Sequence, residues 1–259
     1  MEPIIFSLEA GVATIKLNRP NAFNSVTRTL ALSFIEKLET CQIDPDVRAI
    51  VITGEGKAFC AGQDLKEVTD PDNNPGFVKI LEEHYAPIIR LIRAIEKPVI
   101  AKVNGVAAGA GANIALACDI VIAHEKASFI QAFSAIGLIP DSAGTFFLPR
   151  LVGFQKASAL SMLGDKVSAT EAEQMGMIYK SIAADEFEDF VNKIAGKLAK
   201  APTKGLGLTK RALNASLHNN LEQQLDVEND LQIEASETDD YREGVAAFVA
   251  KRKPTFKGS

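Results

Sequence analysis

The sequence has few of the residues that hold disulfide frameworks or metal ions. Only three of its 259 residues are cysteines, Cys41, Cys60 and Cys118, and only three are histidines. The cysteines are odd in number and lack C-x-x-C spacing, so neither a disulfide framework nor a zinc site is indicated. The histidines are also too scattered for metal-ligand spacing. We therefore expect no metal ion, and a reducing compartment.

The sequence also lacks a positive charge excess and a long apolar run. A net charge of -5 provides no electrostatic footprint for nucleic acid. The longest weakly polar stretch, 105–123, is rich in Ala and Gly and is interrupted by Asn113 and Asp119, unlike a membrane span. Residues 1–10 do not resemble a signal peptide, and 257–259 is not a peroxisomal tripeptide. We expect a cytoplasmic protein with no nucleic-acid or membrane partner.

Several common catalytic and nucleotide-binding motifs are missing. The last glycine of a G-x-G-x-x-G motif counted from Gly109 is replaced by Ile114, and no P-loop precedes Lys57. Ser142 stands in Pro-Asp-Ser-Ala-Gly rather than G-x-S-x-G, with no histidine nearby, which disfavours a serine hydrolase. We expect surface or capping roles for the three histidines, His84, His124 and His218.

What is present is an alternation of apolar strands and amphipathic helices. Strand patterns occur at 4–8, 12–17, 48–53, 99–103, 120–123 and 128–130, and helical patterns begin at 27 and 65 and span 77–95 and 110–118. This order predicts an α/β core with parallel pairing. After about Ser181 only helices are expected, at 187–199, 203–216, 221–235 and 239–251. Leu217, Leu221 and Leu225 recur every four residues, as an apolar helix face requires. We predict a core at 1–200 and a helical C-terminal module at 201–259.

Two glycine-rich loops follow buried strands. Gly62-Gln63 follows the strand at 48–53, and Gly109-Ala110-Gly111 follows the strand at 99–103. Such loops gather at one edge of a parallel sheet, where ligands bind. Two backbone N–H groups aimed at one oxygen would form an oxyanion hole. Alternatively, the glycines only permit tight turns and close packing.

Lone carboxylates allow functional and structural interpretations. Asp141 follows Ile139-Pro140 and has mostly apolar neighbours; burial would raise its pKa and make it a useful base. The other interpretation is a turn and helix N-cap. Asp64 either faces a ligand or, as we favour, caps the helix beginning at Leu65. We expect Cys60 to be a buried hydrophobe and Asp119 to be structural.

Four motifs in order resemble those of the crotonase (enoyl-CoA hydratase/isomerase) superfamily. They are Phe-Cys-Ala-Gly-Gln-Asp-Leu at 59–65, Asn-Gly-Val-Ala-Ala-Gly-Ala-Gly at 104–111, Ala-Cys-Asp-Ile-Val-Ile-Ala at 117–123 and Gly-Leu-Ile-Pro-Asp at 137–141. The resemblance covers essentially the whole chain. It implies a spiral of ββα units, a helical C-terminal trimerisation module, and a homotrimer or dimer of trimers. It also implies an acyl-CoA thioester as substrate and no further cofactor, because CoA is part of the substrate.

The resemblance also assigns residues to the site. The thioester oxygen is expected between the N–H groups of Gln63 and Ala110, with Asp141 as the acid/base. The further substrate-binding residues are expected to be Ala61, Gly62, Asp64, Leu65, Gly109 and Asn113. For Asn113, orienting the substrate and hydrogen bonding within its helix both stay open.

Departures from the family pattern favour isomerisation over hydration. Enoyl-CoA hydratases place two glutamates at positions matching Asn113 and Phe133, and neither is acidic here. The chain is most similar to the ring-1,2-epoxyphenylacetyl-CoA isomerases of phenylacetate breakdown, through the motifs at 62–64, 110–113, 140–142 and 240–245. This branch forms oxepin-CoA and also moves double bonds in unsaturated acyl-CoA.

Two other functions fit parts of the pattern. One is a Δ3,Δ2-enoyl-CoA isomerase of fatty-acid oxidation, which would use the same machinery on linear chains. The other is a non-catalytic CoA-binding scaffold subunit, suggested by the missing glutamates but disfavoured by Asp141. The phenylalanines at 133, 146 and 147 favour a pocket for an aromatic ring, although core packing needs such residues too.

Overall fold

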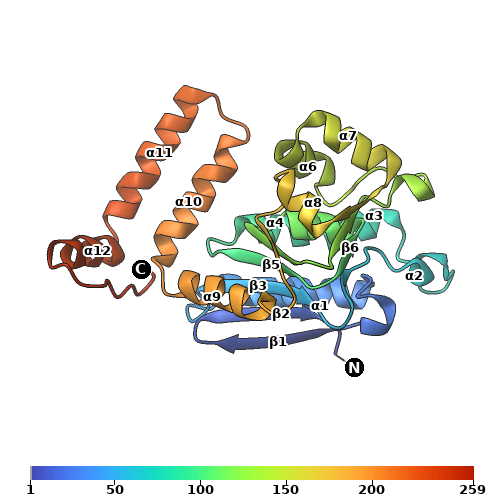
Figure 1. Cartoon of the computed structure of the whole chain (residues 1–259), viewed down its shortest axis with the longest axis horizontal. Coiled ribbons are helices and arrows are strands. Elements are labelled where there is room, and N and C mark those ends of the chain that lie inside the picture. Colours follow the sequence, from blue (N-terminus) through green and yellow to red (C-terminus); the bar gives the residue numbers. More distant parts are fainter. Residues whose placement is uncertain (1) are drawn as a thin grey trace.

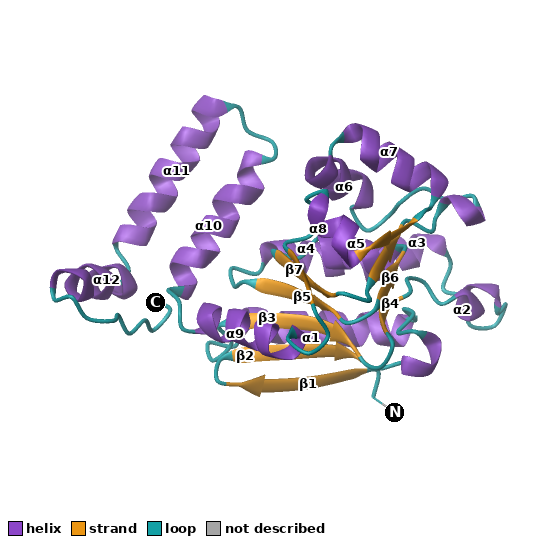
Figure 2. Cartoon of the chain, in the orientation of Figure 1, coloured by secondary structure: helices purple, strands orange, loops and turns teal. Residues whose placement is uncertain are grey.

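Two β-sheets form the body of the molecule in the computed structural model, which describes residues 2–259. The six-stranded sheet has the order β1-β2-β3-β5-β7-β10, and the four-stranded sheet the order β4-β6-β8-β9 (Figure 2). The larger sheet contains β1 (Ile4–Glu9), β2 (Val12–Leu17), β3 (Ala49–Gly54), β5 (Val99–Val103), β7 (Ile120–His124) and β10 (Lys180–Ile182). The smaller contains β4 (Ala58–Cys60), β6 (Val106–Ala108), β8 (Ser128–Ile130) and β9 (Lys166–Ser168).

The chain winds through the two sheets as a spiral. β3 and β4, β5 and β6, and β7 and β8 each place one strand in the larger sheet and the next in the smaller, and the equivalent strands pair in parallel. This confirms the predicted α/β spiral of ββα units. The short strands β4, β6, β9 and β10 were not predicted. Each has only three residues, too few for a clear period-2 pattern, although β8, also of three residues, was predicted.

Helices cover the spiral and then extend from it. They are α1 (Arg28–Ile43), α2 (Leu65–Thr69), α3 (Phe77–Lys79), α4 (Ala86–Ala94), α5 (Ala110–Leu116), α6 (Gly144–Val152), α7 (Phe154–Leu163), α8 (Ala169–Gln174), α9 (Phe187–Ala199), α10 (Thr203–Ser216), α11 (Leu221–Ser236) and α12 (Asp239–Val249), with 3-10 turns η1 (Pro20–Ala22) and η3 (Ser134–Ile136). Figure 1 shows α10, α11 and α12 projecting from the body. In the described range, 2–259, no helix is both long and apolar enough to cross a membrane.

Two expectations about helices need correction. The helix predicted over 77–95 contains a π-helical segment, η2 (Ile80–Tyr85), between α3 and α4. The leucines at 217, 221 and 225 do not share one helix face. Leu217 is the C-cap of α10, whereas Leu221 is the first residue of α11. Asn220 starts the second helix, because its side chain accepts the Gln223 N–H and closes a capping box.

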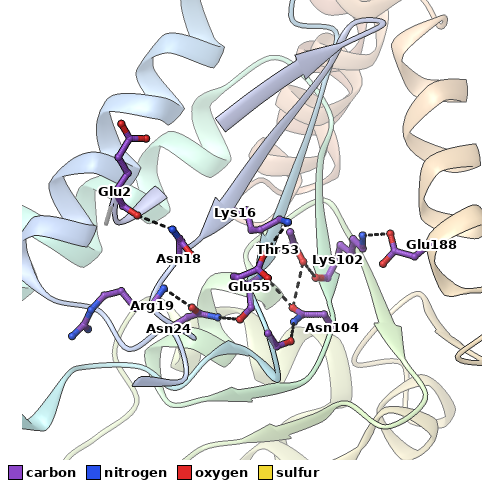
Figure 3. Close-up of polar contacts among 12 residues, drawn as sticks. Glu2, Lys16, Asn18, Arg19, Asn24, Thr53, Glu55, Lys102, Asn104 and Glu188 are labelled. Carbon is purple, nitrogen blue, oxygen red and sulfur yellow. Dashed lines mark hydrogen bonds and ion pairs between the residues drawn. The ribbon is translucent and has the colours of Figure 1, made fainter. Parts of the chain in front are cut away.

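Two asparagines fix the bend between β3 and β4 (Figure 3). Asn24 Nδ2 donates to the carbonyls of Glu55 (2.9 Å) and Ala58 (2.8 Å). Asn104 Oδ1 accepts the Gly54 N–H at 3.1 Å, and its amide donates to the Gly56 carbonyl at 3.0 Å. Backbone groups that a tight bend leaves without a ladder partner are thereby satisfied. The bend delivers the chain to the loop at 61–64.

Candidate active site

The two glycine loops pack against each other. Gly62 has φ +83°, a left-handed conformation that favours glycine. A Cβ on Gly62 would lie 2.9 Å from the Ala108 carbonyl oxygen and 3.3 Å from the Ala110 nitrogen. The missing side chain therefore lets the backbone of the first loop approach that of the second. The sequence separates these loops by almost fifty residues, and the spiral brings them together.

The backbone N–H groups of Gln63 and Ala110 are left outside the ladders. Gln63 forms a parallel bridge with Val26, in which the Val26 N–H donates to the Gly62 carbonyl at 2.7 Å and the Asp64 N–H donates to Val26 at 2.9 Å. In a parallel bridge the N–H of the middle residue points to the other side. Ala110 is the first residue of α5, where N–H groups have no partner within the helix and carry partial positive charge. Such a pair of donors can stabilise an oxyanion.

Asp141 is half-buried in a strained turn. Ser142 and Ala143 both have positive φ, 50° and 60°, which costs non-glycine residues of order 1–3 kcal/mol each. Burial raises the pKa of the Asp141 carboxyl, and the Ser142 hydroxyl, which donates to it at 2.9 Å, opposes the rise. The turn interpretation is confirmed by the Gly144 N–H, which donates to the Asp141 carbonyl at 2.8 Å. The capping interpretation is wrong, since the N-cap of α6 is Ala143 and no side chain caps it.

Asn113 links this turn to α5. Its Nδ2 donates to the Asp141 carbonyl at 2.8 Å, and its Oδ1 accepts the Gln131 amide at 2.8 Å. The side chain is 1% exposed, and a Cβ on Gly144 would lie 2.3 Å from its amide nitrogen. The amide thus connects the turn that carries Asp141 to the helix that begins at Ala110. Hydrogen bonding within the helix was not the right alternative; substrate contact by Asn113 stays a prediction.

The predicted cap role of Asp64 is confirmed. Its carboxylate accepts the N–H groups of Lys66 (2.9 Å) and Glu67 (3.4 Å), and it pairs with Arg19 at 2.8 Å. Burial raises the pKa of Asp64, but hydrogen bonds from Arg19 and Ser25 outweigh it and hold the pKa below its usual value. The carboxylate is therefore committed to the protein. Contacts of Asp64 with substrate stay a prediction. So do the substrate contacts expected of Gly62, half-buried Ala61, exposed Leu65, and Gly109, whose N–H donates to the Ile130 carbonyl at 2.8 Å.

Only one of the three phenylalanines lies beside the glycine loops. The Phe133 ring is 3.8 Å from where a Cβ on Gly109 would lie, and the residue is 6% exposed. Phe146 instead lies 3.8 Å under the Arg150 guanidinium, and Phe147 lies 5.6 Å from that of Arg93. Cation–π contacts and packing therefore account for Phe146 and Phe147.

The remaining candidates divide into confirmed and corrected predictions. Cys60 is a buried hydrophobe, and burial raises its thiol pKa to about 11. Asp119 is structural, since it pairs with Arg93 at 2.9 Å and Lys210 at 2.8 Å. The surface role expected for His84 was wrong: the residue is fully buried, with Nε2 3.2 Å from Arg28 Nη1. The other two histidines lie nearer the surface, where the His124 Nδ1 caps the Lys126 N–H at 3.0 Å.

Sequence reasoning missed Tyr85. Its hydroxyl donates to Gln63 Oε1 at 3.0 Å, beside the predicted oxyanion donor. No sequence signal could have found it, because an aromatic residue in a helical pattern reads as core. Within residues 2–259, no group of three or more His, Cys, Asp or Glu side chains could hold a metal ion.

Residues 7–259 match the family model described as Enoyl-CoA hydratase/isomerase. The chain belongs to this family. The crotonase-type hydratase/isomerase chemistry expected from the sequence is therefore its general activity, and an acyl-CoA thioester is the kind of substrate that fits.

Relatives within the family include both isomerases and hydratases. The chain is 45% identical over 260 aligned positions to the 1,2-epoxyphenylacetyl-CoA isomerase of Escherichia coli K12, covering 100% of this chain and 99% of the relative. It is 33% identical to the trans-2-decenoyl-[acyl-carrier-protein] isomerase of Streptococcus mutans, covering 98% of each. The crystal structure of an enoyl-CoA hydratase from Bacillus anthracis superposes with a TM-score of 0.92 at 31% identity, covering 99% of this chain and 100% of that one.

Proposed function

We propose that this enzyme is an acyl-CoA isomerase that converts ring-1,2-epoxyphenylacetyl-CoA to oxepin-CoA by proton transfer. The observation that carries the proposal is the half-buried Asp141 carboxylate, which lies on a turn whose Asp141 backbone carbonyl accepts the Asn113 amide from the helix that begins at Ala110. One carboxylate, together with two N–H donors outside the sheet and helix ladders, suits the movement of a proton next to a thioester. The 45% identity to an isomerase of this substrate supports the choice.

The proposed reaction begins with the thioester oxygen between the N–H groups of Gln63 and Ala110. The Asp141 carboxylate takes a proton from the α-carbon, and the C–H electrons form a carbon–carbon double bond while the carbonyl oxygen becomes an oxyanion. Each N–H donor of this kind is commonly worth about 2.7–4 kcal/mol in the transition state. The raised pKa of Asp141 brings its basicity closer to that required at neutral pH.

The proton then returns from Asp141 to a ring carbon. The electrons of the enolate shift into the ring system, and the ring-fusion C–C bond of the epoxide opens to the seven-membered oxepin. No atom is gained or lost, so neither water nor a redox partner is needed. Hydration is disfavoured because Asn113 and Phe133 occupy the positions where a hydratase carries its two glutamates. Asn113 is also engaged by Gln131 and the Asp141 turn.

A second candidate is a Δ3,Δ2-enoyl-CoA isomerase. The same carboxylate would remove the α-proton of a linear 3-enoyl-CoA and return it to the γ-carbon. The 33% identity to an isomerase of decenoyl chains supports linear enoyl thioesters as this second substrate class.

Turnover of both CoA esters by wild type and Asp141→Asn tests the proposal. We expect wild type to convert the aromatic epoxide faster than 3-hexenoyl-CoA, and Asp141→Asn to lose about 10²–10⁴-fold in kcat. The exposed Asp46→Asn is the matched control and should keep wild-type rates. Equal rates for wild type and Asp141→Asn would refute the role of Asp141. Faster turnover of the linear ester would favour the second candidate, and no turnover of either would favour a scaffold subunit.

We further propose that the enzyme works in the cytoplasm as a homotrimer or a dimer of trimers. Large apolar side chains on the C-terminal helices support assembly through 201–259. Examples are Leu221 (71% exposed), Ile233 (62%), Phe248 (85%) and Val249 (76%).

A further inference from the structure

The Gln63 side chain is held at both ends by residues outside its own loop. Its Oε1 accepts the Tyr85 hydroxyl at 3.0 Å, and its Nε2 donates to Glu67 Oε2 at 3.2 Å. Tyr85 ends the π-helical segment η2, and Glu67 lies on α2. A side-chain amide has one acceptor and two donors, so both ends of Gln63 are engaged by protein groups.

Glu67 is itself anchored. Both of its carboxylate oxygens accept the Arg28 backbone N–H, at 3.0 and 3.2 Å, at the first residue of α1. A carboxylate at a helix N-terminus is stabilised by the helix dipole as well as by the hydrogen bonds. The chain of contacts Arg28–Glu67–Gln63–Tyr85 therefore connects three helical elements to one loop residue.

Tyr85 is built into the core around this one polar contact. Its side chain is 1% exposed, and a buried phenol requires a hydrogen-bond partner. Burial raises the pKa of Tyr85 well above its usual value, with further contributions from Cys60, Asp141 and Glu67. The hydroxyl is thus protonated and a donor, within electrostatic reach of the proposed base. π-helical turns of this kind occur frequently at functional sites.

We propose that Tyr85 is a positioning residue that acts through the Gln63 side chain to hold the Gln63 N–H in the oxyanion hole. This inference rests on the oxyanion role proposed for Gln63. The backbone bridge to Val26 fixes the loop on one side only, through the Gly62 carbonyl and the Asp64 N–H. The Tyr85 and Glu67 contacts fix the side chain of Gln63, the residue between Gly62 and Asp64.

Loss of this support should affect the transition state more than substrate binding. Negative charge on the thioester oxygen develops only as the proton leaves, so a misplaced donor removes stabilisation at that point. We therefore expect kcat to fall while KM changes little.

A double-mutant cycle tests whether Tyr85 acts through Gln63. Tyr85→Phe removes only the hydroxyl, and Gln63→Met removes both side-chain hydrogen bonds but keeps the backbone N–H. We expect each single variant to lower kcat about tenfold with KM within about twofold, and the double variant to be no worse than Gln63→Met alone. Tyr179→Phe, at a 57% exposed tyrosine, is the control and should leave kcat unchanged.

A spectroscopic measurement keeps this test separate from turnover. Infrared difference spectra of bound phenylacetyl-CoA, labelled with ¹³C at the thioester carbonyl, report polarisation of the C=O bond without any reaction. We expect a downshift in wild type and Tyr179→Phe, and a smaller downshift in Tyr85→Phe and Gln63→Met. If the proposed reaction is wrong, wild type fails to turn over the esters, yet the spectral comparison still tests the positioning role.

Two results would overturn the inference. One is an unchanged carbonyl shift and kcat in Tyr85→Phe. The other is an equal effect of Tyr85→Phe in the wild-type and Gln63→Met backgrounds, since independent effects mean that the hydroxyl does not act through Gln63. If Tyr85→Phe does not fold, as judged by circular dichroism, Glu67→Met at the half-buried opposite end of the amide replaces it in the same cycle.

Discussion

Asp141 lowers the stability of the folded protein at neutral pH, and its proposed catalytic role explains why such a residue is kept. Burial raises its pKa, so the native state binds a proton at this carboxyl more tightly than the unfolded chain does. The resulting stabilisation is fully present below the unfolded pKa of about 3.9 and is lost as the pH rises through the folded pKa. At neutral pH the ionised carboxylate therefore opposes folding, which fits a site where function is kept at the expense of stability.

The first prediction is that Asp141→Asn raises the melting temperature at pH 7. Asparagine has no charge to desolvate and can still accept the Ser142 hydroxyl. The gain over wild type should shrink as the pH falls toward about 4, where aspartate also becomes neutral. Thermal unfolding followed by circular dichroism across this pH range measures it, with Asp46→Asn as the exposed control. A lower melting temperature for Asp141→Asn at pH 7 would contradict the argument.

His84 predicts the opposite pH dependence. Burial, and then the charge of Arg28, lower its pKa, so the folded state binds this proton less tightly than the unfolded chain. Stability is present above the unfolded pKa of about 6.5 and is lost as the pH falls through the folded pKa. His84→Gln should therefore lose less stability than wild type between pH 7.5 and about 5, measured by urea unfolding. Identical losses would show that His84 is not the titrating group.

At the scale of elements, pattern length decided what the sequence could predict. The helices α9 to α12, and the strands of the larger sheet other than β10, were predicted within a few residues, because each is long enough to show its period. β4, β6, β9 and β10 have three residues each and were not predicted, since so few residues show no reliable period. The π-helical segment η2 could not be predicted either. An apolar helical pattern shows which side of a helix is buried, but not the wider π-helical turn in which His84 and Tyr85 are buried.

Asn113 provides a test at this scale. Asn113→Ala leaves the Asp141 carbonyl and the Gln131 amide without their partner, in a place from which water is largely excluded. We expect a loss of about 1–3 kcal/mol in the free energy of unfolding and a lower kcat, because the base-bearing turn is no longer held. Urea unfolding and turnover measure the two effects. Unchanged stability would mean that neighbouring groups or water satisfy the freed atoms.

At the scale of the whole molecule, a buried ion pair joins α10 to the sheet. Lys210 (7% exposed side chain) contacts Asp119 (19%) at 2.8 Å, and Asp119 also accepts the Val99 N–H at 2.8 Å. We expect Asp119→Asn to cost about 3 kcal/mol in urea unfolding, because it leaves a buried lysine without its counter-charge. The matched control is Glu188→Gln, which breaks the more exposed pair with Lys102 and should cost under about 1 kcal/mol. Equal losses in the free energy of unfolding for the two variants would show that the buried pair does not join α10 to the sheet.

Assembly gives the last prediction. Phe248 lies on α12 with 85% of its surface exposed, among other apolar side chains. If this surface is covered in a trimer, Phe248→Asp should yield a smaller species in light scattering after size exclusion. Ile43→Asp, at an 81% exposed position at the end of α1, is the control and should assemble as wild type does. A monomeric wild type would refute the proposed assembly.

The sequence could indicate site residues that lie in a recognisable motif, but not the contacts between segments that are far apart in the sequence. Gln63, Ala110 and Asp141 could be proposed as site residues because their motifs resemble a known family. The partners of Asn113 and the contact of Tyr85 with Gln63 could not be found, since they join segments distant in sequence. Sequence patterns also could not rule out a cap role for Asp141, because that depends on Ala143, rather than Asp141, being the N-cap of α6.

Helix α5 sets a distance. Ala110 provides a donor at its start, and Asn113 holds the base-bearing turn three residues later, about 4.5 Å further along the axis. In the proposed mechanism, less than one turn of rigid helix therefore fixes the distance between the thioester oxygen at Ala110 and the proton carried by Asp141, and no flexible loop is involved. One residue inserted between them would rotate Asn113 by about 100° away from the Asp141 carbonyl. In this proposed mechanism, the helix that binds the carbonyl therefore also determines which carbon of the substrate exchanges a proton.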